Sequence, residues 1–237
     1  MNKITVKRIG IIGAMKLEVE QLISHMTIDD KQEVAGNIYY SGSLHNQDIV
    51  VTCGGVGKVN AASSTQILIS HFEVDAIINT GIAGGMQPNV KVCDIVISTD
   101  VTHHDVRKNQ MISCFPHQAF FVSDERLIEL AEKTIRSSSF QSNYHIGRIV
   151  SGESFISDPA IKNLIIEAYE PHCVEMEGAA IGQVSYLNNI PFVVIRCISD
   201  NADDEATMSY ETFETIAANQ SSKLVMDMMK NLKYEGV

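Results

Sequence analysis

Residues 173–203 read CVEMEGAAIGQVSYLNNIPFVVIRCISDNAD, and the predicted fold is built around this stretch. It opens with two carboxylates, Glu175 and Glu177, and continues through small and apolar residues typical of a buried helix. Asn-Asn-Ile-Pro then leads into an apolar strand, FVVI, which is followed by Arg196 and Asp200. Open α/β sheets bind ligands beyond the carboxyl ends of such strands, so the pattern predicts an α/β fold with a site here.

The rest of the chain alternates strands with helices. Apolar runs end in glycines at three places, at residue 13, at 54–57 and at 81–85. Glycine lets the backbone approach a ligand closely, so we expect glycine loops beside the site. Because no composition break, repeat or linker interrupts the alternation, the sequence predicts a single α/β domain over residues 1–237. We expect a twisted, mixed and mostly parallel central sheet flanked by helices.

Local signals predict several further elements. Residues 38–43 and 48–52 have the pattern of a β-hairpin, with LHNQ as its turn. Asp158 and Pro159 suit the N-cap and the first position of a helix. Residues 210–233 are predicted to form a long amphipathic helix. Its expected apolar face comprises Phe213, Ile216, Ala217, Leu224, Val225 and Met228.

Residues 101–121, VTHHDVRKNQMISCFPHQAFF, form the least regular region. His103, His104 and Asp105 have the side chains of metal ligands. Neighbouring residues of an extended chain point to opposite faces, however, so the two histidines do not readily share one ion. The sequence favours a polar loop with both histidines facing solvent. A loop of this length in a compact domain is usually a lid or an interface element.

Composition limits the class of function. The chain carries 18 Lys and Arg residues against 29 Asp and Glu residues, a formal net charge of −11. This charge repels nucleic-acid phosphates and anionic membranes, so neither is expected as a partner. The five cysteines lack a Cys-x-x-Cys pair and predict neither a disulfide framework nor a zinc site. The apolar run near the N-terminus is too short for a signal sequence, and we expect a cytoplasmic protein.

No motif indicates a cofactor. The glycine runs lack the Gly-x-Gly-x-x-Gly spacing of a dinucleotide-binding turn. Lys58 follows glycines, but Val59 stands where a phosphate-binding P-loop has Ser or Thr. We therefore expect neither a cofactor nor a metal ion in the site.

Several blocks of the sequence together resemble one family. They are GIIGAM with Glu18, GGVGKVNAA, INTGIAGG, VSGESFI, VEMEGAA and VVIRCISDNAD, spread over nearly the whole chain. These blocks are similar to those of the 5′-methylthioadenosine/S-adenosylhomocysteine nucleosidases, which have the purine nucleoside phosphorylase-like fold. The resemblance implies hydrolysis of the N-glycosidic bond of either nucleoside, releasing adenine and a thioribose. It also implies a homodimer that acts in methionine salvage.

The same resemblance implies roles for individual residues. Asp200 is expected to protonate the purine N7, and Ser199 to orient Asp200. Glu177 is expected to bind the ribose hydroxyls, and Glu18 to position the attacking water together with Glu177 and Arg196. The other expected substrate contacts are Phe155 and the backbone of Ile156 at the base, Glu175 and Met176 at the sugar, Ile82 with the backbone of Ala83 and Gly84 near the water, and Met15, Val56 and Tyr210 at the 5′ end.

These residue types suit the chemistry. Adenine leaves poorly as an anion, so its ring needs a proton, which a buried carboxylic acid with a raised pKa supplies. The ribose left behind resembles an oxocarbenium ion, and nearby carboxylates stabilise its charge and accept a proton from water. Each residue alone also has a structural explanation: Asp200 suits a turn after a strand, and Glu18 suits the first turn of a helix.

Two departures from the family pattern leave alternatives open. Ile82 stands where a Ser is common, and the segment after His104 is shorter than usual. In the family this segment contributes to the dimer contact and covers the 5′ substituent, so the sequence leaves the preferred 5′ group undecided. The rival functions are a purine nucleoside phosphorylase that uses phosphate and a nucleoside-binding protein without turnover. Glu18 favours water, because its charge repels a phosphate in the same place.

Overall fold

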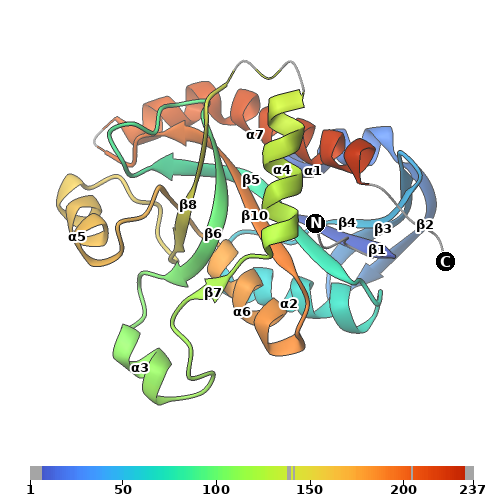
Figure 1. The fold of residues 1–237 in the computed structure, drawn as a ribbon, viewed down its shortest axis with the longest axis horizontal. Coiled ribbons are helices and arrows are strands. Elements are labelled where there is room, and N and C mark those ends of the chain that lie inside the picture. Colours follow the sequence, from blue (N-terminus) through green and yellow to red (C-terminus); the bar gives the residue numbers. More distant parts are fainter. Residues whose placement is uncertain (1–6, 138–139, 141, 204, 233–237) are drawn as a thin grey trace.

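The computed structural model describes residues 7–137, 140, 142–203 and 205–232, and it has the predicted α/β fold (Figure 1). A mixed sheet forms the centre of the described structure, and helices cover both of its faces. The strands are β1 (Arg8–Gly13), β2 (Thr27–Val34), β3 (Asn37–Leu44), β4 (Gln47–Cys53), β5 (Ala76–Gly85), β6 (Ile95–His103), β7 (Phe121–Val122), β8 (Tyr144–Ser151), β9 (Cys173–Glu175) and β10 (Phe192–Asp200). The helices are α1 (Lys16–His25), α2 (Lys58–Ser70), α3 (Lys108–Ser113), α4 (Glu125–Ser137), α5 (Pro159–Tyr169), α6 (Gly178–Asn188) and α7 (Ala206–Asn231).

The sheet closes on itself along part of its width. Its strands follow the order β10-β6-β8-β9-β5-β1-β4-β3-β2, and β10 also pairs with β5. Strands β5, β10, β6, β8 and β9 therefore form a closed ring, while β1, β4, β3 and β2 continue from β5 as an open sheet. The sequence predicted only the open arrangement. The ring depends on the short strand β9, which pairs with the end of β5, and local patterns do not reveal so distant a pairing.

Parallel pairs form two groups of strands. One group contains β4, β1, β5 and β10, and the other contains β6, β8 and β9. Antiparallel pairs between β10 and β6 and between β5 and β9 join the groups. Every residue of β5 and β10 is buried, as expected for central strands covered on both faces. Polar side chains at the carboxyl ends of β1, β5, β9 and β10 are thus shielded from solvent.

The helices divide the core between the two faces of the sheet. Helices α1, α4 and α7 pack on one face, and α2 and α6 pack on the other (Figure 1). Helix α6 is rich in small residues, and a Cβ atom added at Gly182 would lie 2.4 Å from Val101 Cγ2. Small side chains therefore allow α6 to lie close to the sheet, directly after the carboxylates of residues 175 and 177.

The apolar face predicted for the C-terminal helix was partly wrong. Helix α7 starts at Ala206, and Ala217, Leu224, Val225 and Met228 are buried as predicted. Phe213 is only half-buried, however, and Ile216 is 48% exposed. The cause is position along the helix: between Ala206 and Ala217 none of its side chains is buried, so this part of α7 lies at the edge of the core. Residue 233, the predicted end, lies outside the described residues.

Two further predictions need correction, and one strand was not predicted. The glycine run 81–85 is not a loop but the last part of β5. Strand β6 continues through His103, which is buried and lies 3.0 Å from Gln183 through its Nε2 atom, so the expected polar loop with solvent-facing histidines was wrong. The exposed strand β2, TIDDKQEV, was missed because its sequence lacks apolar alternation. The predicted hairpin and the Asp158 N-cap are confirmed.

No helix in the described part of the chain is both long and apolar enough to cross a lipid bilayer. The five cysteines are all free, and two of them, Cys173 and Cys197, are buried.

The division of the core predicts unequal effects of two isoleucine substitutions. Ile78 lies in β5 with none of its surface exposed, whereas Ile216 of α7 is 48% exposed. Ile78→Ala is expected to lower the free energy of unfolding by about 2–5 kcal/mol, because it leaves a cavity in a packed core. Ile216→Ala should change it by less than about 1 kcal/mol. Urea denaturation measures both, and equal losses would contradict the packing described for α7.

Candidate active site

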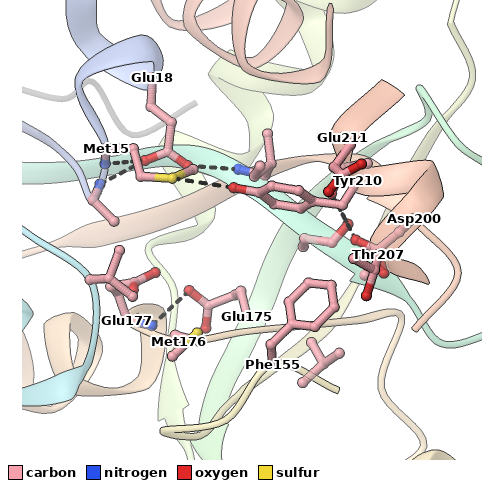
Figure 2. Close-up of a pocket in the computed structure, with 17 residues that line it drawn as sticks. Met15, Glu18, Phe155, Glu175, Met176, Glu177, Asp200, Thr207, Tyr210 and Glu211 are labelled. Atoms are coloured by element: carbon pink, nitrogen blue, oxygen red, sulfur yellow. Dashed lines mark hydrogen bonds between the residues drawn. The ribbon is translucent and has the colours of Figure 1, made fainter. Parts of the chain in front are cut away.

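A pocket of about 380 Å³ lies where the ends of β1, β5, β9 and β10 meet the start of α7 (Figure 2). Figure 2 shows Glu18, Glu175, Glu177 and Asp200 around the same space, with the ring of Phe155 among them. The residues that line the pocket are Ala14, Met15, Glu18, Val56, Ile82, Ala83, Gly84, Phe155, Val174, Glu175, Met176, Glu177, Ser199, Asp200, Thr207, Tyr210 and Glu211.

A buried arginine lies behind the pocket. Arg196 of β10 has no exposed surface, and its Nη2 atom donates to Asn79 Oδ1 at 2.7 Å and to Glu177 Oε2 at 3.4 Å. The same nitrogen donates to Glu175 Oε2. A buried charge is costly unless it is paired, and two carboxylates pair with this one through Nη2, although Nε and Nη1 have no hydrogen-bond partner among the described residues. The guanidinium therefore fixes the side of the pocket that holds Glu175 and Glu177.

Glu175 serves mainly to hold the chain in place. Its Oε2 atom accepts the N–H groups of Glu177 and Gly178, at 3.1 and 2.7 Å, at the start of α6. Its Oε1 atom accepts the hydroxyl of Ser151 at the end of β8. The carboxylate satisfies helix N–H groups that have no partner within the helix. Glu175 lines the pocket, but its oxygens already have protein partners.

Gly81 is required where Arg196 and Glu18 meet. A Cβ atom at this position would lie 1.9 Å from Arg196 Nη1 and 2.5 Å from Glu18 Oε1. Both charged groups therefore crowd the same side of strand β5. Gly81 thus makes room for the protein's own charged side chains, while Gly84 of the same glycine run lines the pocket.

Glu18 is buried at the first turn of α1. Its Oε2 atom accepts the N–H groups of Ala14 and Met15, at 2.7 and 2.8 Å, and Oε1 accepts that of Ile82 at 3.1 Å. Burial raises the pKa of Glu18, although Arg196 and these N–H groups oppose the rise. The carboxylate thus has a fixed orientation and a proton affinity above that of an exposed glutamate.

Glu177 lies at the N-cap position of α6. Its Oε1 atom accepts the N–H of Gly57 at 2.8 Å, just before α2. Burial and the neighbouring charge of Glu175 raise the pKa of Glu177 to about 7, against the opposing charge of Arg196. This side chain therefore changes protonation state near neutral pH.

Asp200 ends β10 on the other side of the pocket. Its Oδ2 atom accepts the hydroxyl of Ser199 at 2.9 Å, and Oδ1 accepts the N–H of Ala202 at 2.8 Å. Burial raises the pKa of Asp200, and these two hydrogen bonds oppose the rise. The residue is therefore a carboxyl group held in one orientation with an increased affinity for a proton.

Apolar and aromatic side chains form the remaining wall. Phe155, in the segment between β8 and α5, is 46% exposed and contacts the Tyr210 ring edge-on, with ring centroids 5.7 Å apart (Figure 2). The Tyr210 hydroxyl donates to Met15 Sδ at 3.4 Å. Val56 is half-exposed at the pocket. A flat ring can stack on Phe155, and an apolar chain can lie between Met15, Val56 and Tyr210.

The pocket differs from the prediction in four additions and two absences. Arg196 and Ile156 do not line it: Arg196 lies behind the carboxylates, and the Ile156 side chain packs in the core with Val150 and Val174. The additions are Ala14, Val174, Thr207 and Glu211. Ala14 and Val174 carry no chemical signal in the sequence. Thr207 lies about one turn before Tyr210, and Glu211 lies one residue after it. The predicted helix with Tyr210 at the pocket could therefore have suggested both residues as further lining residues.

The charged groups determine what the pocket can do. Its lining contains five carboxyl groups and, among the described residues, no Lys, Arg or His. No group of three or more His, Cys, Asp or Glu side chains in the described parts of the chain has the arrangement of a metal site. Carboxyl groups with raised pKa values stand on opposite sides, which suits acid catalysis at one end of a bound molecule and base catalysis at the other.

Comparisons with known proteins agree with this geometry. A model of the phosphorylase superfamily matches residues 8–230. A 5′-methylthioadenosine/S-adenosylhomocysteine nucleosidase from Anoxybacillus flavithermus is 42% identical over 229 residues, which cover 94% of this chain and 98% of that protein.

Two solved structures of nucleosidases with the same name are also similar to this chain. The one from Neisseria meningitidis, in complex with methylthio-immucillin-A, has a TM-score of 0.90 at 36% identity, covering 95% of this chain and 100% of that one. The one from Colwellia psychrerythraea, in complex with adenine, has a TM-score of 0.92 at 36% identity and covers all of both chains. The chain therefore belongs to the phosphorylase superfamily and, within it, to the 5′-methylthioadenosine/S-adenosylhomocysteine nucleosidase family.

Proposed function

We propose that this protein hydrolyses the N-glycosidic bond of 5′-methylthioadenosine, S-adenosylhomocysteine or both, releasing adenine and the thioribose. The observation that supports this most strongly is the pocket itself. It holds Asp200 on one side and Glu18 with Glu177 on the other, close to an aromatic ring that suits a purine. The role of each pocket residue is inferred from that geometry together with family membership.

Asp200 is the general acid at the base. Burial raises the pKa of Asp200, which favours the protonated form that an acid needs, and Ser199 holds its carboxyl group through a hydrogen bond of 2.9 Å. The proton passes to adenine N7 while the C1′–N9 bond breaks and its electron pair moves to the purine. Adenine then leaves as a neutral molecule. Phe155 stacks on the ring, and the main chain of Ile156 binds the edge of the base.

Glu177 and Glu18 act at the sugar. Glu177 binds the ribose hydroxyls, and Met176 packs against the ring. Glu18, with Glu177 and the Arg196 charge behind them, positions a water molecule. This water attacks C1′, and Glu18 accepts the proton that the water loses. The negative charges stabilise the oxocarbenium-like transition state. Ile82 contributes its backbone N–H, which donates to Glu18, and this contact does not require the Ser hydroxyl common in the family.

Water rather than phosphate is the nucleophile. A phosphorylase needs cations around the phosphate, and the described pocket lining has none. Arg196 lies behind the carboxylates, but Glu175 and Glu177 neutralise it. A phosphate beside Glu18 would meet like charge at short range, which is strongly unfavourable in a buried site.

Met15, Val56 and Tyr210 receive the 5′ substituent. Glu211 stands at the same end of the pocket, so neutral or positively charged substituents are favoured over anionic ones. We also propose a homodimer. Ile112 is 49% exposed and Phe115 is 75% exposed, and apolar side chains on one short segment suit a protein contact. Cytoplasmic location is consistent with five free cysteines, which persist in a reducing compartment.

Replacing the carboxyl group of Asp200 by an amide tests its role as the general acid. Asp200→Asn is expected to lower kcat for 5′-methylthioadenosine by about 10²–10⁴-fold, because the amide cannot protonate N7. Adenine binding, measured by calorimetry, should largely remain. Asp30→Asn is the control, since it makes the same chemical change on the exposed strand β2, outside the pocket. Activity of Asp200→Asn within about tenfold of the wild type would exclude Asp200 as the acid.

The pH profile distinguishes the two sugar-side carboxylates. Because Glu177 has a pKa of about 7 and binds ribose as a carboxylate, kcat/KM should fall as the pH drops below about 7. Glu177→Gln should weaken ribose binding and remove this limb of the profile. Glu18→Gln should lower kcat severely but keep the limb. A limb near pH 7 that survives Glu177→Gln would assign the titration to another group.

Substrate and nucleophile are tested together. Adenine release from 5′-methylthioadenosine, S-adenosylhomocysteine and adenosine, and hypoxanthine release from inosine, are measured with and without inorganic phosphate. We expect release from the two thionucleosides at the same rate in both conditions, with free thioribose as the product. An absolute phosphate requirement with a sugar 1-phosphate product would replace hydrolysis by phosphorolysis. Tight nucleoside binding without release would favour the nucleoside-binding protein.

A further inference from the structure

The segment that carries Phe155 is held by a group of charged residues outside the pocket. Residues 152–158, between β8 and α5, have no regular secondary structure. The far end of the segment is anchored by Ile156, buried in the core, and by Asp158, which caps α5 through the N–H of Ala160. The near end, Gly152 and Glu153, must be fixed by other contacts, because it precedes the half-exposed ring of Phe155.

Residues after β6 supply two of these contacts. The His104 ring packs so closely on Gly152 that an added Cβ atom would lie 2.2 Å from His104 Nε2. Asp105 Oδ2 accepts the N–H of Glu153 at 3.0 Å. These two residues lie in the region that the sequence predicted to be a solvent-facing loop. The residues that follow β6 therefore support the base-binding segment.

Lys58 completes the group at the start of α2. Its Nζ atom lies 2.7 and 2.8 Å from the two Asp105 oxygens, and its backbone N–H donates to Glu153 Oε1 at 2.9 Å. The side chains of Lys58 and Asp105 are only 18% and 30% exposed, so the ion pair is shielded more than an open surface pair. Burial disfavours the Asp105 carboxylate, but the hydrogen bonds from Lys58 and the Glu153 N–H outweigh it and lower the pKa of Asp105.

The same end of α2 also holds Glu177. The N–H of Gly57 donates to Glu177 Oε1 at 2.8 Å, and the next N–H, that of Lys58, donates to Glu153. Gly57 has φ +96°, and a Cβ atom there would lie 2.8 Å from Glu153 Oε2. The two consecutive amides thus bind Glu177 on the sugar side and Glu153 on the base-binding segment. The position of these two carboxylates relative to each other therefore depends on this end of α2.

We infer that Lys58, Asp105 and Glu153 form a positioning unit that sets Phe155 over the base and Glu177 against the ribose. This inference rests on the proposed function, because it assigns Phe155 and Glu177 to the two halves of a nucleoside. None of the three residues lines the pocket. Each acts through a neighbour, and a small displacement of a binding group is enough to reduce catalysis by large factors.

Lys58→Met tests the unit, because methionine keeps the length of the side chain and removes its charge. We expect weaker adenine binding by about fivefold and a kcat for 5′-methylthioadenosine lower by about tenfold, since Asp105 loses the ion pair that holds it against the Glu153 N–H, and the segment that carries Phe155 loosens. Lys58→Arg should restore most of each loss. Lys16→Met is the control: Lys16 is 84% exposed and lies 3.8 Å from Glu20, so its charge supports no part of the site.

A spectroscopic measurement separates positioning from general destabilisation. The chain contains no Trp, so F155W places the only Trp on the segment, where it can be excited separately from the Tyr residues. Its fluorescence anisotropy should fall when Lys58→Met is added, with the unfolding temperature nearly unchanged, and Lys58→Arg should restore it. Unchanged anisotropy and adenine affinity within about twofold in the Lys58→Met variants would overturn the inference. A wild type that releases no adenine would refute the proposed function alone, because the anisotropy still reports on the segment.

Discussion

The structure depends on one buried cation. Arg196 lies in the middle of the sheet with no exposed surface, between Asn79, Glu175 and Glu177. Removing a guanidinium from water costs several kcal/mol unless charged partners surround it. The fold therefore requires the surrounding carboxylates. They are required wherever this arginine is buried, and they carry the chemistry of the pocket.

Several local features follow from this requirement. Gly81 has no side chain because Arg196 Nη1 and Glu18 Oε1 occupy the space of a Cβ atom. Glu175 caps α6 and pairs with Arg196, so the helix starts where the charge needs it. The same burial that makes Arg196 costly also raises the pKa of Glu18 and Glu177. Stability and reactivity thus have a common origin in one low-dielectric cluster.

The sequence predicted the parts of this arrangement that are encoded locally. Glu18 follows a strand and opens a helix, and Asp200 ends an apolar strand, so both could be placed near strand ends. The closure of the sheet could not be predicted, because it depends on the three-residue strand β9 pairing with the end of β5. His103 was misassigned for a related reason: its burial comes from Gln183, far along the chain, and no local pattern reports that contact.

The two ends of the pocket are fixed to different degrees. The end proposed to bind the reacting bond is built from buried carboxylates that have hydrogen-bond partners in the protein, so substitution there disturbs a network. The other end is built by the first turns of α7, where Thr207 and Glu211 are exposed and no residue between Ala206 and Ala217 is buried. Side chains in that part can change without opening the core. With the proposed residue roles, the buried carboxylates preserve the glycosidic chemistry, and the start of α7 is the place where preference for the 5′ substituent can be altered at little cost in stability.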